Sequence, residues 1–90
     1  MSVRRDGPVI RLEGDCPVEE AETLAALLEG EDGLAVDVAL CRHLHTALVQ
    51  ALLRFAPKIV GEPENRVLRE LILPAIRVHG AQSLRFRHEG

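Results

Sequence analysis

The segment AVDVALCRHLHTALVQALL, residues 35–53, decides the fold because a polar break in it separates two apolar runs. The first run, residues 34–40, is too short for a helix and rich in Val and Leu, which predicts a strand covered on both faces. The second run, residues 46–55, predicts a helix whose only polar interior positions are Gln50 and Arg54. The break CRHLH is therefore predicted to be a loop between a buried strand and a largely buried helix.

Two polar residues of this segment require a physical explanation. Asp37 interrupts the apolar strand, and a buried carboxylate is costly unless backbone amides or a basic partner satisfy it. We therefore expect Asp37 near an end of the strand. Thr46 stands where the helix begins, and its hydroxyl can cap amides of the following turn while remaining exposed.

The residues before this segment predict a hairpin and a helix. Asp6-Gly7 favours a tight turn between two short antiparallel strands, and Ile10 and Leu12 give the second strand one apolar face. Residues 15–30 follow as an amphipathic helix, with proline in its first turn and glycine beyond its last leucine. The predicted inner stripe of this helix is Val18, Ala21, Leu24, Ala25 and Leu28.

The residues after the segment predict a strand, a third helix and a last strand. Pro57 ends the second helix, and KIVG supplies a short strand. The third helix lies within residues 62–80, and Pro74 is expected to kink or end it. After Gly80, SLRFRHE alternates like an edge strand, with a frayed tail as the alternative. The predicted inner side of the third helix is Val67, Leu68, Leu71 and Ile72.

Strands that alternate with helices imply a largely parallel sheet with right-handed crossovers. The expected fold class is therefore α/β, with a small, mixed, mostly parallel sheet of four to five strands packed against about three helices. A length of 90 residues predicts one domain, residues 1–90, with a single core.

Composition and charge argue against several classes of function. With two Phe, no Trp and no Tyr, stacking on nucleic-acid bases is not expected. A formal charge of -3 likewise argues against binding a phosphate backbone. The chain has no apolar stretch long enough to insert into a membrane and no apolar signal segment at its start, so we expect a cytoplasmic protein. In that compartment Cys16 and Cys41 are expected to be thiols.

The order of these elements resembles the STAS domain, which sulphate transporters share with anti-sigma factor antagonists. The stretches that carry the likeness are VIRLEGDCPVEEAETLAALL, AVDVALCRHLHTALVQALL and KIVGEP before a helix, so it covers nearly the whole chain. In the antagonists of that family, the loop before the leucine-rich helix presents Asp and then Ser or Thr, and a partner kinase phosphorylates the hydroxyl. By position, Thr46 matches the hydroxyl residue and Asp37 the acidic residue of the strand. The sequence departs from the pattern at His45, which replaces the Asp, and at Leu48, where glycine usually stands.

The resemblance implies a module without enzymatic activity or cofactor that docks a protein partner. That partner would be an anti-sigma factor or a kinase-like regulator, and phosphorylation of Thr46 would switch the contact. An alternative is a permanent subunit of a larger assembly, such as a lipid transporter, attached to its ABC-type ATPase; self-association is also compatible with the sequence. The residues expected to bind the partner are Asp37, Arg42, His43, His45, Thr46, Ala47, Val49 and Gln50.

Two rival interpretations use the same polar break. Cys41, His43 and His45 recur at every second residue, so in an extended segment they would share one side and could bind a transition metal. A fourth ligand, such as His79 or an acidic side chain, has no spacing that recommends it. A catalytic cysteine with a histidine base is also conceivable, but no other motif supplies an oxyanion site, so no enzyme is expected.

Overall fold

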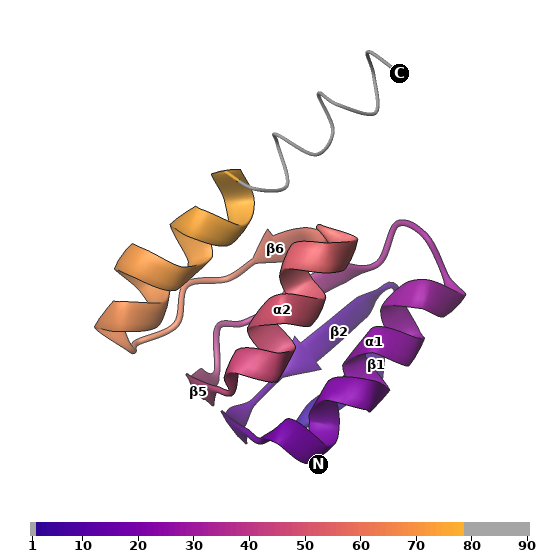
Figure 1. The fold of residues 1–90 in the computed structure, drawn as a ribbon, viewed down its shortest axis with the longest axis horizontal. Helices are drawn as coiled ribbons and strands as arrows, with labels where there is room; N and C mark the ends of the chain where they lie inside the picture. The colour runs from indigo at the N-terminus through magenta and orange to yellow at the C-terminus, as the bar shows by residue number, and fades with distance from the viewer. Residues whose placement is uncertain (1, 79–90) are drawn as a thin grey trace.

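A computed structural model of the chain describes residues 2–78, which form two sheets and three helices (Figure 1). The strands are β1 (Val3–Asp6), β2 (Val9–Leu12), β3 (Gly14–Cys16), β4 (Ala35–Asp37), β5 (Cys41–Leu44) and β6 (Lys58–Val60). The first two helices are α1 (Ala21–Gly30), which follows the 3-10 turn η1 (Val18–Glu20), and α2 (Thr46–Phe55). The third helix covers residues 66–78 and contains the π-helical turn η2 (Leu68–Ile72).

The larger sheet has the strand order β1-β2-β4-β6. Strands β1 and β2 are antiparallel, and Gly7 between them has a positive φ of 60°, which a glycine adopts without steric cost. Strands β2 and β4, and then β4 and β6, are parallel. The predicted hairpin and the mixed, mostly parallel α/β fold are therefore confirmed.

A second sheet, of two parallel strands, was not predicted. Strand β3 pairs with β5, and two backbone hydrogen bonds flank the pairing: Gly14 donates to Leu40 at 2.8 Å, and His45 donates to Cys16 at 3.0 Å. Residues 41–44, predicted as a loop, are thus a strand. The prediction was wrong because the partner strand has the sequence GDC, which is too short and too polar to be recognised on its own.

The core lies between the larger sheet and the two helices α1 and α2, which run side by side across one face of the sheet in Figure 1. The predicted burial of Leu24 and Leu28 in α1 is confirmed. Val18 is 47% exposed because it lies in η1, ahead of the helix, so its place in the inner stripe was wrong. The core residues with an exposed fraction of 0% are Ile10, Leu12, Cys16, Leu24, Val36, Leu48 and Leu52.

The third helix continues past Pro74 to Val78, the last residue that the structure describes, so the proline does not end it. A proline in an α-helix lacks an N–H group and clashes with the carbonyl four residues earlier. The wider π-helical turn ends at Ile72, shortly before Pro74, and the amide of Leu73, its C-cap, donates to the Leu68 carbonyl, five residues back.

The inward-facing side chains of the third helix differ in part from the predicted ones. Leu68, Leu73 and Ile76 are buried, whereas Val67 and Leu71 are exposed, so the predicted inner side was wrong at these last two residues. The predicted strand of residues 83–89 lies outside the described residues. Within the described part, no helix combines the length and the apolar character needed to cross a membrane.

Candidate functional site

The start of α2 places Thr46 at the surface. Thr46 is the first residue of the helix and is exposed, as the sequence predicts. The cap, however, is supplied by His45, whose backbone is extended and whose Nδ1 accepts a hydrogen bond from the Ala47 amide at 3.0 Å. The predicted threonine cap was therefore wrong: Thr46 lies one residue too late in the chain to be the N-cap. The Thr46 hydroxyl is not needed to hold this end of the helix.

Seven of the eight residues predicted to bind a partner lie between residues 42 and 50, and we call these seven the docking face after that prediction. The eighth, Asp37, lies at the end of β4. Arg42 and His43 are exposed on β5, and Leu44, which follows them, is buried. Within α2, Gln50 is exposed one turn beyond Thr46, whereas Val49 is half-buried and packs against the core. The docking face consists of Arg42, His43, His45, Thr46, Ala47, Val49 and Gln50.

A groove of about 280 Å³ lies between α1 and α2, and Ala47 and Gln50 of the docking face are part of its lining. Alanines four residues apart face it from both helices: Ala21 and Ala25 from α1, and Ala47 and Ala51 from α2. Side chains of this size leave the space between the two helices open. The contribution of α1 was missed, although the spacing of its alanines was a visible signal. The remaining lining residues are Glu22, Gln50, Arg54 and Phe55.

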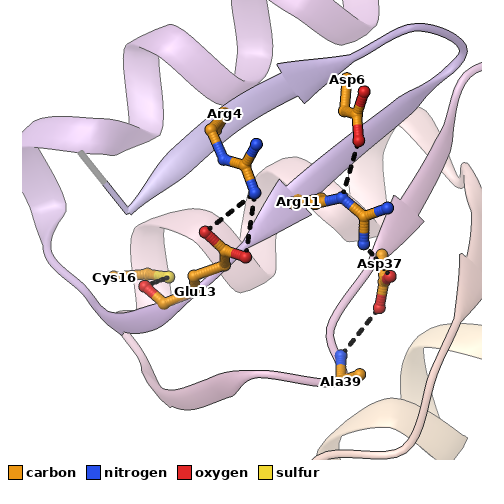
Figure 2. A network of polar contacts seen from close by, with 7 residues as sticks. All are labelled: Arg4, Asp6, Arg11, Glu13, Cys16, Asp37 and Ala39. Carbon is orange, nitrogen blue, oxygen red and sulfur yellow. Dashed lines mark hydrogen bonds and ion pairs between the residues drawn. The ribbon is translucent and has the colours of Figure 1, made fainter.

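Asp37 lies at the end of β4, where the sequence predicts it, and both expected kinds of partner satisfy its carboxylate (Figure 2). Oδ2 lies 2.7 Å from Nη1 of Arg11, the residue directly opposite on β2, and Oδ1 accepts the Ala39 amide at 2.9 Å. Nε of Arg11 also donates to Asp6 at 3.1 Å, and this hydrogen bond is the main cause of the raised pKa of Arg11. Asp37 therefore holds the turn after β4 to the sheet.

Gly61 comes close to the same turn. It has a φ of 85°, and a β-carbon at this position would lie 2.6 Å from Oδ1 of Asp37 and 2.9 Å from the Ala39 nitrogen. Only a residue without a side chain fits here. The chain after β6 thus packs directly on the turn that Asp37 caps.

Asn65 joins the docking face to the third helix, a role that the sequence analysis missed. Its Oδ1 accepts the Leu68 amide at 3.1 Å, which caps the helix, and its Nδ2 donates to the Arg42 carbonyl at 3.1 Å. Asparagine is a common cap, so the first bond had a sequence signal. The second bond depends on the tertiary arrangement alone.

The structure does not bring Cys41, His43 and His45 together on one side. Cys41 is buried, while both histidines are exposed, because an irregularity in the pairing of β3 with β5 breaks the alternation along β5. The Cys41 sulfur lies 3.6 Å from the backbone carbonyl of His43. Among residues 2–78 there is no group of three or more His, Cys, Asp or Glu side chains arranged to hold a metal ion.

Comparisons of this chain with family models, with characterised proteins and with solved structures gave no match.

Proposed function

We propose that this chain is a protein-interaction module that docks a regulatory protein through the docking face, and that phosphorylation of Thr46 ends the contact. The observation that carries the proposal is the exposure of Thr46 at the first residue of α2, between the exposed β5 residues Arg42 and His43 and the groove. A kinase can reach a hydroxyl at this position, and a partner that covers the face must cover it too.

The switch would be electrostatic. A phosphate on Thr46 would lie at the positive end of the α2 dipole, where negative charge is favourable, so the folded domain would tolerate it. The same phosphate would add up to two negative charges to any surface pressed against the docking face. Since His45 supplies the cap, the modification would leave the helix start intact and change only the affinity for the partner.

The groove would give the partner an anchor. Its alanine walls can accept an apolar side chain, and Glu22 and Arg54 offer charges of opposite sign beside it. We infer that the partner inserts a side chain between α1 and α2 while its charged residues meet the docking face.

The resemblance to STAS domains suggests the class of partner: an anti-sigma factor or kinase-like regulator in the cytoplasm. The proposal involves no catalytic step and no cofactor. Its parts are the exposed hydroxyl, the strand and helix that present it, and a partner surface that senses its charge.

A permanent subunit of a larger assembly, such as one bound to an ABC-type ATPase, is the second candidate. Four large apolar side chains of the described residues favour it because they are more than half exposed and a stable partner would cover them. They are Leu40 at 65%, Val67 at 54%, Leu71 at 67% and Val78 at 58%. In this case the contact would not depend on phosphorylation.

Capture from the source cells with a tagged chain separates the two candidates. We compare the parent with Thr46→Ala and Thr46→Glu, quantify every captured protein by mass spectrometry, and map phosphate on the chain itself. The proposed switch predicts one protein that the parent and the alanine variant retain and the glutamate variant loses. It also predicts phosphate on Thr46 in cells.

Ala26→Glu is the matched control, because it adds the same charge to an exposed α1 position that belongs neither to the docking face nor to the lining of the groove. This variant should retain the partner. Equal capture by all four chains, with Thr46 unmodified, would contradict the switch and support the permanent subunit.

A further inference from the structure

Cys16 and Cys41 are 25 positions apart in the sequence, yet their sulfur atoms lie 3.9 Å from each other. Cys16 ends β3 and Cys41 begins β5, and the two strands are direct neighbours. Both side chains are buried, with exposed fractions of 0% and 2%. Both are free thiols in this structure.

The surrounding backbone holds the two cysteines in place. The Cys16 carbonyl accepts the His45 amide at 3.0 Å, and Gly14, the residue paired with Cys41, donates to Leu40 at 2.8 Å. Figure 2 shows the Cys16 side chain next to the backbone of Glu13, whose carbonyl oxygen lies 4.0 Å from the sulfur. A disulfide needs a sulfur separation of about 2.05 Å, so closing the bond requires the sulfurs to approach by roughly 2 Å. Side-chain rotation and a small shift of two short strands can supply this movement.

The two sulfurs share a hydrogen bond in which either thiol can be the donor. Hydrogen bonding to Cys41 lowers the pKa of Cys16, whereas hydrogen bonding to Cys16, together with burial, raises the pKa of Cys41. The first thiolate of the pair therefore forms at Cys16, and once it has formed only Cys41 has a proton to donate across this contact. A thiolate is the reactive form toward oxidants.

We propose that Cys16 and Cys41 form a peroxide-responsive dithiol–disulfide pair that ties β3 to β5. The Cys16 thiolate attacks hydrogen peroxide, the O–O bond breaks, and Cys16 becomes a sulfenic acid with release of hydroxide. The Cys41 sulfur then attacks the Cys16 sulfur, the S–O bond breaks, and the hydroxide takes the Cys41 proton. Overall, two thiols and one hydrogen peroxide give one disulfide and two waters.

The bond would fix the strand that leads into the docking face. Residues 42–46 follow Cys41 directly, and Cys16 precedes η1 and α1, so the cross-link would join the two segments that lead into α1 and α2. It would also constrain the unfolded chain and so stabilise the fold. The pair acts in this way whether or not the docking face has the proposed partner.

Titration of the native chain with hydrogen peroxide tests this proposal. Intact mass spectrometry without reductant should show the loss of two hydrogen atoms, and peptide mapping should find the Cys16–Cys41 linkage. The oxidised chain should unfold at a temperature at least about 5 °C higher, and dithiothreitol should reverse both changes.

Single variants test the order of attack. In Cys41→Ser, Cys16 should accumulate a sulfenic acid that dimedone traps, whereas Cys41 in Cys16→Ser should react at least about tenfold more slowly. Three outcomes would contradict the proposed disulfide pair. They are the addition of oxygen atoms to the native parent, a disulfide-linked dimer, and a Cys16–Cys41 linkage that forms only in denaturant. Equal rates of trapping in the two single variants would overturn the assigned roles.

Discussion

At the scale of single residues, polar groups form hydrogen bonds at the junctions between strands and helices. His45 is one of these, because its Nδ1 satisfies the Ala47 amide at the start of α2. This bond requires a ring nitrogen without a proton, and histidine is not among the preferred caps. A substitution at residue 45 can therefore stabilise the start of α2.

We expect His45→Asp to raise the free energy of unfolding at pH 7 by about 0.5–1 kcal/mol, because a carboxylate both caps the helix and favours the positive end of its dipole. His45→Ala should lower it by about 1 kcal/mol, since the Ala47 amide loses its acceptor. Urea unfolding followed by circular dichroism measures both. An alanine variant as stable as the parent would show that the cap contributes nothing.

Gly61 allows a test of close backbone packing with an internal control. Gly61→Ala should cost roughly 3 kcal/mol or more, because the new β-carbon would collide with the carboxylate of Asp37 and with Ala39. Gly33 has a similar φ of 82° but nothing within 4 Å of the added carbon. Gly33→Ala should therefore cost only the conformational strain, about 1–2 kcal/mol.

Thermal or urea unfolding of both variants provides the comparison. If Gly61→Ala is no less stable than Gly33→Ala, the contact between residue 61 and the turn after β4 is not tight.

At this scale, the position of a residue can be predicted from the sequence when a single physical requirement determines it. The positions of Asp37 and Thr46 could be predicted, because a carboxylate in an apolar strand needs partners and a polar residue before a leucine-rich helix marks its start. The capping role of His45 could not be predicted, since it depends on the residue at which the helix begins. The observed N-cap, His45, lies one position before the expected N-cap, Thr46.

At the scale of elements, the third helix is anchored by its first turn. Asn65 caps this helix and binds the Arg42 carbonyl, so it connects the helix to β5. Asn65→Ala should lower the free energy of unfolding by about 1–2 kcal/mol, because both bonds are lost. Amide hydrogen exchange of residues 66–69 should rise more than that of α1.

Asn65→Ser separates the two bonds. Serine can cap the helix, but it is too short to reach Arg42, so this variant should lose less stability than the alanine variant. Equal loss in both would show that the cap carries no weight and that the contact with Arg42 is the whole effect.

Two features were not predicted from the sequence: strand β5 and the continuation of the third helix beyond Pro74. The first depends on a neighbouring strand and the second on π-helical hydrogen bonds. Strand β5 exists because β3 lies beside it, and neither segment has enough alternation to be predicted alone. The passage of the third helix beyond Pro74 depends on the π-helical turn before it. The inner side of a helix is predicted by assuming 3.6 residues per turn. The π-helical turn at Leu68–Ile72 has more residues per turn, and it lies within the segment whose inner side was predicted.

At the scale of the whole molecule, the topology was the most predictable feature. Alternating strands and helices, a short hairpin and the apolar character of residues 34–40 are enough to specify a mostly parallel sheet with helices on it. The meeting of Cys16 with Cys41, and the groove between α1 and α2, required the assembled fold. Long-range proximity of this kind leaves no local pattern in the sequence.

The whole molecule also sets how the switch would act. In the proposed switch, a charge at residue 46 would change the affinity for the partner without unfolding the domain, because side chains of α1, α2 and the sheet belong to one core. The effect should therefore appear in binding and not in the stability of the free chain.

The most direct measurement is a calorimetric titration of the captured partner with the unmodified chain and with the chain phosphorylated at Thr46. The account predicts at least about tenfold weaker binding of the phosphorylated chain, equivalent to about 1.4 kcal/mol, with the thermal midpoint of the free chain nearly unchanged. Equal affinities of the two forms would contradict it.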